Sequence, residues 1–281
     1  MRMLLPAVLL MMAQLAPAPA TLPWASTITR SPAGAFPDLK PCRVSYDLSW
    51  NNLLSAGSAR VVMQEAGDFQ VARAEAGTSG LARTLWLYDC TMTSVMHRGE
   101  LRALHMEHSE TDTRETAAYQ VRFGDREVST LTSLTPAGGS TKKTTQVCPY
   151  GPVDDLQSAI LYVRSQPLKT GDAITRVVQP FDRPYLATFT VTGREQRKVE
   201  GVAYPTIKLD VKIRRLDRRT LLPGSFKKMK TATIWVSDDA WRLPVEMHAN
   251  VFVGFISATL TRREELTGPE AQGTLPQAMK P

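Results

Sequence analysis

Histidine and carboxylate side chains come close together in one stretch, where His105, Glu107 and His108 follow His97. Imidazole and carboxylate groups are zinc ligands, and residues two apart on a strand share one face of a sheet. His105 and Glu107 therefore converge, whereas His108 points to the other face, so a complete ligand set requires a second strand. The pattern favours an ordinary polar strand face, and we predict no metal site.

Two aspartate pairs, Asp154-Asp155 and Asp238-Asp239, could supply the two carboxyl groups of a glycosidase. Adjacent residues diverge on strands and helices, so we expect the first pair to begin a helix and the second to form a turn. Gly77-Thr78-Ser79-Gly80 lacks the spacing of a nucleophile elbow. Cys90 and His97 would form a reactive couple only if folding brought them together. We therefore predict no catalytic residues and no cofactor, which makes enzymatic activity the less favoured interpretation.

The strongest charge signal is a basic stretch that reads as a strand, a loop and a second strand. We predict that its cations contact an anionic membrane surface: Arg214, Arg215, Arg218, Arg219, Lys227 and Lys228. Between them lie the apolar residues of the predicted tip: Leu221, Leu222, Pro223 and Phe226. The alternative is a solvated hairpin whose charges prevent edge-to-edge aggregation.

The first twenty residues carry one positive charge, then an apolar run, then small residues at 16–20. This order is typical of a secretory signal peptide over residues 1–20, cleaved after Ala18 or Ala20. Removing it leaves 33 of the 34 basic residues against 27 acidic ones, a net charge of +6. No cysteine lies near the cleavage point for lipid attachment. We therefore predict a soluble exported protein of the periplasm, a monomer that binds no nucleic acid.

Three cysteines, Cys42, Cys90 and Cys148, are expected in an oxidising compartment to form one disulfide and leave one free thiol. Sequence alone does not choose the pair. We favour Cys90 with Cys148, because each closes a block of predicted strands while Cys42 stands at the start of the domain.

The elements that must position these side chains are mostly strands. In residues 42–50, for example, Val44, Tyr46 and Leu48 alternate with polar residues, which is the period of a half-buried antiparallel strand. Residues 153–165 have helical spacing instead, with Leu156, Ala159, Ile160 and Val163 on one face. We therefore predict an all-β fold, a large curved antiparallel sheet forming an open barrel or half-barrel, with one amphipathic helix packed on its concave side.

The domain organisation follows from where this pattern begins and ends. Residues 21–41 contain four prolines and no periodicity, which predicts an irregular lead-in. Residues 42–266 are expected to form a single β-rich domain. Residues 267–281 have few large apolar groups and are predicted to be a disordered tail.

Several motifs occur in an order that resembles one family of exported bacterial proteins. They are residues 54–59 after the first strand, Asp155 followed by Ser158, Tyr162 and Arg164, then Gly171-Asp172, and finally residues 235–245. Together they resemble the domain-of-unknown-function 3108 family over about residues 42–266. That resemblance implies a secreted β-rich domain, akin to the half-barrel carriers of periplasmic lipoproteins, and it implies no catalytic residues.

The predicted function is a non-catalytic exported protein of the cell envelope, a carrier or scaffold whose concave surface binds an apolar or amphiphilic ligand such as a lipid. The predicted ligand contacts are six aromatic residues: Tyr46, Trp50, Tyr119, Phe123, Tyr162 and Phe189. One alternative is a structural envelope protein whose interior is filled by these side chains. Another is an envelope hydrolase with an unfamiliar site.

Overall fold

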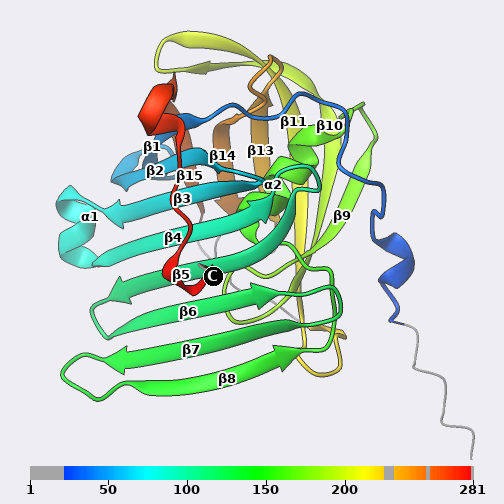
Figure 1. Cartoon of the computed structure of the whole chain (residues 1–281). Helices are drawn as coiled ribbons and strands as arrows, with labels where there is room; N and C mark the ends of the chain where they lie inside the picture. Colours follow the sequence, from blue (N-terminus) through cyan, green and yellow to red (C-terminus); the bar gives the residue numbers. More distant parts are fainter. Residues whose placement is uncertain (1–21, 225–230, 251–253, 280–281) are drawn as a thin grey trace, which may run out of the picture.

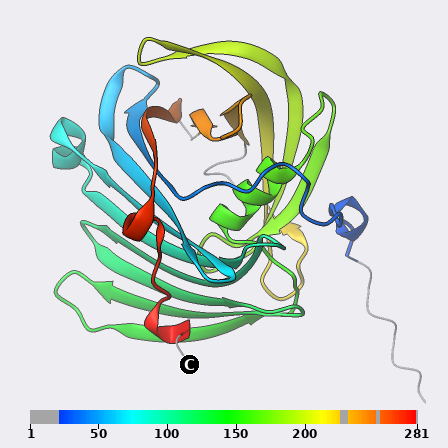
Figure 2. The same cartoon turned by 45° about the horizontal axis from the view of Figure 1, so that its top comes forward.

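The computed structural model describes residues 22–224, 231–250 and 254–279. Within these ranges fifteen strands form one antiparallel sheet, in the order β8-β7-β6-β5-β4-β3-β2-β1-β15-β14-β13-β11-β10-β9, with β12 paired to β11. The sheet curls into a barrel-like shape (Figures 1 and 2). It does not close, because its two edge strands, β8 and β9, do not pair with each other. The predicted all-β class and the large curved antiparallel sheet are confirmed.

The first eight strands form a meander in which each strand pairs with the next in sequence. Their bounds are Cys42–Trp50 for β1, Leu54–Ala66 for β2, Phe69–Thr78 for β3, Tyr88–His97 for β4, Arg102–Asp112 for β5, Glu115–Phe123 for β6, Val128–Pro136 for β7 and Lys142–Cys148 for β8. The short helix α1, Gly80–Leu85, separates β3 from β4. Most side chains of β8 are exposed, so no apolar alternation marks this edge strand in the sequence.

The remaining strands follow helix α2, Leu156–Ser165. Their bounds are Ala173–Val178 for β9, Tyr185–Val199 for β10, Val202–Leu216 for β11, Pro223–Gly224 for β12, Thr231–Ser237 for β13, Pro244–Asn250 for β14 and Phe255–Glu265 for β15. Strand β15 returns to pair with β1 along its length, which joins the two halves of the sheet. Among the described residues no helix is long and apolar enough to cross a membrane.

Helix α2 lies on the concave side of the sheet, as predicted (Figure 2). Asp155 caps it through a capping box: its carboxylate accepts from the backbone N–H of Ser158, and the Ser158 hydroxyl accepts from the N–H of Asp155. The buried face differs from the predicted one. Leu161 is buried, whereas Ile160 is half-buried and Leu156 is exposed. The helix meets the sheet on more than one side, so one stripe does not describe its buried surface.

Buried side chains form three clusters around this arrangement. One joins α2 to Phe189 and its neighbours on β9, β10, β11 and β13. A second packs the opposite face of β9–β11, through Leu186, against Met106 and other residues of β4–β7. The third surrounds Leu161 with side chains of β1–β4, β14 and β15. Both faces of β9–β11 are therefore covered, and α2 links the two halves of the sheet.

The lead-in is irregular apart from the short 3-10 turn η1, Ala25–Thr27, but it is packed. Trp24 is buried, and its indole N–H donates to the carbonyl of Leu221 at 2.7 Å. The backbone N–H of Thr29 donates to Thr175 of the edge strand β9 at 2.9 Å. The segment then crosses the mouth of the barrel to reach β1 (Figure 2). Leu221 therefore belongs to the core, which corrects its predicted place at an exposed apolar tip.

The C-terminal segment runs over the face of β2 and β3 that points away from α2. It contains two 3-10 turns, η2 at Gly268–Ala271 and η3 at Gln277–Met279. The Gln64 amide donates to the carbonyls of Glu270 and Gln272, and Arg73 donates to the carbonyl of Thr274. Disorder was the prediction for residues 267–281. The structure instead holds residues 267–279 through polar side chains of the sheet, which composition does not reveal.

All three cysteines are free, which corrects the prediction of a disulfide between Cys90 and Cys148. Cys90 lies on β4 and Cys148 on β8, four strands away in the sheet, and Cys42 lies on β1. Four strand spacings amount to about 19 Å, and a disulfide needs Cα atoms within about 7 Å. Burial raises the pKa of Cys42 to about 12 and that of Cys148 to about 11, so both are unreactive thiols at neutral pH.

Candidate functional site

The six aromatic residues predicted to bind a ligand do not converge on one cavity. Tyr162 and Phe189 lie in the cluster beside α2, Phe123 in the cluster of β4–β7, and Tyr46 in the cluster of β1–β4. All four are buried, and the hydroxyl groups of Tyr46 and Tyr162 donate to the carbonyls of Pro244 and Ser31. Tyr119 is half-buried and Trp50 is exposed. These six residues fill different parts of the molecule.

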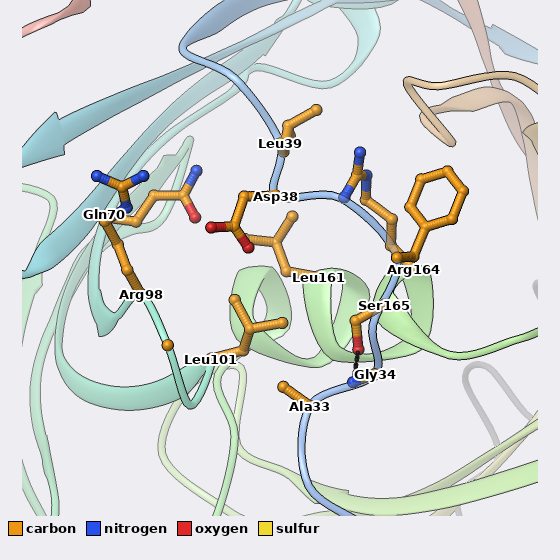
Figure 3. A pocket seen from close by; sticks show the side chains of 12 residues that line it. Ala33, Gly34, Asp38, Leu39, Gln70, Arg98, Leu101, Leu161, Arg164 and Ser165 are labelled. Atoms are coloured by element: carbon orange, nitrogen blue, oxygen red, sulfur yellow. Dashed lines mark hydrogen bonds between the residues drawn. The ribbon is translucent and has the colours of Figure 1, made fainter.

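The cavity beside the C-terminal end of α2 is small. It measures about 80 Å³ and lies between the lead-in, α2 and the turn that joins β4 to β5 (Figure 3). Leu161, Leu101 and Gln70 point into it, as do Arg98, Arg164 and Asp38. Ligand sites for drug-sized molecules measure about 300–1,000 Å³. This cavity therefore has room for water and not for an acyl chain.

Two arginines close the end of α2. Arg164 donates to the carbonyls of Trp241, Pro37 and Ala240, and Arg242 donates to those of Arg164 and Gln166. Burial, aided by the charge of Arg242, lowers the pKa of Arg164 to about 10. These guanidinium groups satisfy helix-end and loop carbonyls, so their role is to hold the lead-in, α2 and the β13–β14 turn together.

Phe36 of the lead-in lies between the same two arginines. Its ring centroid is 5.0 Å from the guanidinium carbon of Arg164 and 3.6 Å from that of Arg242. On the other side of α2, where Ile160 and Val163 meet β10, β11 and β13, the remaining space is about 10 Å³. These two spaces beside α2 are therefore too small for a drug-sized ligand.

A larger cleft lies at the end of the sheet where β10 begins and β11 ends. Its volume is about 490 Å³, and it is lined by Arg183, Arg215, Leu216, Asp217, Arg218, Arg219 and Gly224. We call this the arginine cleft. Three of the predicted membrane-contact residues, Arg215, Arg218 and Arg219, thus line one cavity, together with Arg183, which the sequence did not mark because it lies on a different loop.

The other predicted cations are placed differently. Arg214 is the neighbour of Arg215 on β11 and points to the opposite face, because strand side chains alternate. Lys227, Lys228 and Phe226 lie outside the described residues. Leu222 and Pro223 are exposed beside the cleft, as the prediction of an apolar tip requires.

The end of β11 builds the arginine cleft by a turn at Asp217. The Asp217 carboxylate accepts from the backbone N–H groups of Arg219 and Thr220, which hold its pKa below the usual range. The buried Leu216 anchors the strand end in the core. The turn therefore fixes the backbone from which Arg218 and Arg219 project.

The charges of the cleft are only partly compensated. Arg218 and Arg183 both pair with the carboxylate of Asp182, the latter at 3.3 Å. Arg215 and Arg219 form no ion pair with any described residue. With four guanidinium groups against Asp182 and Asp217, the cleft carries an excess of about two positive charges, which fits an anionic group.

Another groove, of about 400 Å³, crosses β1–β4 on the opposite side from α2 and is less suited to charged ligands. Its lining includes Arg60, Glu75 and Asp89. Arg60 pairs with Glu75 at 3.5 Å, and Asp89 forms two hydrogen bonds with Arg83. These charges compensate one another within the protein.

The histidine-rich stretch is divided between the two faces of β5, as predicted. His105 contacts Glu107 at 3.3 Å on the face away from α2, and His108 lies on the other face. There it joins a polar cluster that the sequence analysis missed, in which Tyr88 and Tyr119 donate to the two oxygens of Glu110 at 3.0 and 3.3 Å. Phe181 packs against His108, which is buried, whereas Tyr88, Glu110 and Tyr119 are half-buried. The described residues contain no group of three metal-ligating side chains.

The two aspartate pairs have structural partners. Asp154 binds Arg176 through two hydrogen bonds, and Asp155 caps α2 while accepting from the Ser94 hydroxyl. Burial raises the pKa of Asp155 to about 6. Asp239 accepts from Ser237 and from the N–H groups of the β13–β14 turn, as predicted for a turn. Neither pair faces a cleft with its carboxyl groups free.

An incomplete antiparallel barrel around one helix defines a β-barrel-like protein. The fold is similar to the crystal structure of a β-barrel-like protein of domain of unknown function DUF1849 from Brucella abortus, with a TM-score of 0.54 and 9% identity over 83% of this chain and 100% of that one. A weaker similarity, with a TM-score of 0.35 and 8% identity over 83% and 99%, links it to a protein from Bacteroides fragilis described as exported with a YmcC-like fold.

The chain belongs to the family described as Protein of unknown function (DUF3108), whose model matches residues 45–261. The resemblance seen in the sequence is therefore confirmed. No curated protein matches the chain.

Proposed function

We propose that this protein is a non-catalytic, exported protein of the cell envelope that binds the anionic head of an amphiphilic ligand in the arginine cleft. The observation that carries this proposal is the combination of a cavity of about 490 Å³ with two arginines, Arg215 and Arg219, that form no ion pair with any described residue, although Arg219 lies near the carboxylate of Asp217. Guanidinium groups bind phosphate and carboxylate in a bidentate manner. Export rests on the residue pattern at positions 1–20.

The filled interior supports a ligand held at the end of the sheet rather than inside it. The spaces next to α2 measure about 80 and 10 Å³, below what an acyl chain needs. Beside the cleft, the exposed Leu222 offers apolar surface next to the cations, whereas Leu216 is buried beneath them. An amphiphile would place its head among the arginines and its first methylene groups against Leu222.

Calorimetric titration with lysophosphatidylglycerol below its micelle concentration tests this proposal. The double variant Arg215→Gln/Arg219→Gln is expected to bind about tenfold or more weakly, because each lost charge contact near an anionic head contributes about 1 kcal/mol. Arg214→Gln is the matched control, since it removes the same charge one residue away on the opposite face of β11. Lysophosphatidylcholine, whose head has no net charge, should bind weakly to all three proteins.

Equal affinity of the wild type and the double variant would contradict the proposal. So would an equal loss in Arg214→Gln, because that would indicate general charge attraction rather than a site. If no amphiphile binds the wild type, the second candidate function, a structural envelope protein, is favoured. The observation behind that candidate is the filling of the interior by three core clusters.

A further inference from the structure

Exposed apolar side chains are concentrated on two neighbouring turns. Ten large apolar side chains of the described residues are exposed, and six of them are Trp50, Leu53, Leu54, Leu81, Leu85 and Trp86. Leu53 is 89% and Leu85 76% exposed, which is close to complete exposure for leucine. We call these six residues the apolar tips. Such a concentration on one region marks an interaction surface, whereas scattered exposed leucines do not.

The two turns lie side by side at one end of the sheet. Residues 50–54 form the β1–β2 turn, and residues 80–86 comprise α1 with the residue that follows it. The N–H of Ser79 donates to the carbonyl of Ala56 at 3.1 Å, and Gly57 pairs with Thr78 between β2 and β3. Figure 1 shows α1 projecting beyond the ends of the strands it connects. The tips are therefore a convex projection and not a groove.

The backbone holds the β1–β2 turn in place. Asn51 and Asn52 adopt left-handed conformations with φ of 52° and 56°. The side-chain carbonyl of Asn51 accepts from the backbone N–H of Phe255 at 2.8 Å, and the backbone N–H of Asn51 donates to the Phe255 carbonyl at 2.9 Å. Left-handed conformations of non-glycine residues require support from their surroundings, and β15 provides it here. Leu53 and Leu54 are thus presented to solvent by an anchored turn.

The charge distribution around the tips fits an anionic membrane. Residues 50–54 carry no charge, and the only charged residue of α1, Arg83, is compensated by Asp89 at 2.8 and 2.9 Å. The strand order β2-β1-β15-β14-β13-β11 places the cationic end of β11 at the same end of the sheet, with Arg214 and Arg219 exposed. Five strand spacings amount to about 24 Å along that end. The uncharged projection therefore has cations on its β11 side, whereas the β5–β6 turn on its other side carries Asp112, which pairs with Arg114.

We propose that the apolar tips insert into the interfacial layer of an anionic membrane while the cations at the end of β11 contact its headgroups. A convex pair of turns needs a deformable partner, and a bilayer surface accepts leucine and tryptophan side chains without a preformed pocket. Tryptophan is suited to the headgroup level because its ring is apolar with one polar N–H. The apolar tips are separate from the arginine cleft, so their insertion does not depend on the proposed ligand, although Arg219 belongs both to the cleft and to the cationic end of β11.

Flotation with vesicles of phosphatidylglycerol and phosphatidylethanolamine tests the tips directly. The double variant Leu53→Ser/Leu85→Ser is expected to bind about tenfold or more weakly than the wild type, since it removes two of the most exposed apolar groups from the contact. Val202→Ser is the matched control. Val202 is 51% exposed but begins β11, at the other end of the sheet, so binding should be unchanged.

Quenching of tryptophan fluorescence by brominated lipids identifies which residues insert. Trp50 and Trp86 are 45% and 52% exposed, whereas Trp24 and Trp235 are buried. Vesicles should quench the wild type, and Trp50→Phe/Trp86→Phe should lose most of that quenching. Undiminished quenching in this variant would overturn the proposal.

Equal vesicle binding by the wild type and Leu53→Ser/Leu85→Ser would also overturn the proposal, and unchanged melting temperatures would show that the variants are folded. Titration with lysophosphatidylglycerol separates this proposal from the previous one. The leucine variant should retain its affinity for that amphiphile, whereas the Arg215→Gln/Arg219→Gln variant should lose it. If Val202→Ser also lost vesicle binding, the contact would not be confined to the end of the sheet that carries the apolar tips, which contradicts the proposal.

Discussion

Arg164 and Arg242, beside α2, can be compared with Arg215 and Arg219, at the end of β11. The first pair donates to backbone carbonyls from three separate segments. The second pair faces a cleft and forms no ion pair with any described residue. A guanidinium group whose donors are used by the protein contributes to stability, and one whose donors face a cleft is available to a ligand. Residue type alone does not distinguish these roles.

The largest expected effect follows from removing Arg164. Arg164→Met leaves the carbonyls of Trp241, Ala240 and Pro37 without their donor, and unsatisfied buried groups cost about 1–3 kcal/mol each. We expect the free energy of unfolding to fall by about 3 kcal/mol or more, as measured by urea denaturation. Arg215→Met is the control and should change it little. Similar losses in both variants would remove the distinction between the two pairs.

The next effect separates the two sides of α2. Leu161 is buried, so Leu161→Ala should cost about 2–5 kcal/mol. Ile160 was expected from the sequence to be fully buried, but it is half-buried beside a space of about 10 Å³. Ile160→Ala should therefore cost clearly less, about 1 kcal/mol. Thermal denaturation of both variants measures the difference, and the reverse order would mean that the helix is rotated from the position described.

Asp155 should make stability depend on pH. Its pKa is raised by burial from 3.8 to about 6 in the folded protein, so the folded state binds a proton more tightly than the unfolded state does. The protonated Asp155 therefore contributes fully to stability below about pH 4, and this contribution is lost as the pH rises through 6. The free energy of unfolding should fall by at most about 3 kcal/mol over that range. Asp155→Asn keeps a capping side chain but cannot ionise. The difference in unfolding free energy between wild type and variant should change between pH 4 and 7; a constant difference would contradict this.

The smallest effect on stability is expected in the arginine cleft. Arg215→Gln/Arg219→Gln removes two cations that stabilise no described ion pair, so the free energy of unfolding should change by less than about 0.5 kcal/mol. A rise in stability would show that these charges repel one another in the absence of a ligand. A loss of several kcal/mol would indicate that they have a structural role after all.

The sequence revealed the fold class because strands and helices leave local patterns. The alternation of Val44, Tyr46 and Leu48 predicted β1. The helical spacing of apolar residues after Asp155 predicted a helix that this aspartate caps. Strand β8 was missed because an exposed edge strand has no apolar alternation. The fate of the C-terminal segment was missed because it is held by Gln64 and Arg73, more than 200 residues earlier in the chain.

The candidate site was predicted only in part. The basic stretch correctly drew attention to Arg215, Arg218 and Arg219, because a run of cations is visible in one dimension. Arg183 was not found, since it reaches the same cleft from the β9–β10 loop. The predicted aromatic ligand contacts were chosen by residue type, and packing distributes them over three clusters and the surface. Their role in ligand binding stays a prediction.

The amino-acid sequence by itself determined the strands, the capped helix and the family, because these depend on periodicity and on motifs between near neighbours. Tertiary structure decided what the side chains do. The pairing of β1 with β15 and the curvature around α2 determine whether a side chain meets a carbonyl, a core or solvent. Leu221 lies in the core and Leu53 is exposed. Arg164 donates to backbone carbonyls, whereas Arg215 lines a cleft. Such outcomes depend on contacts between distant residues, which no local pattern contains.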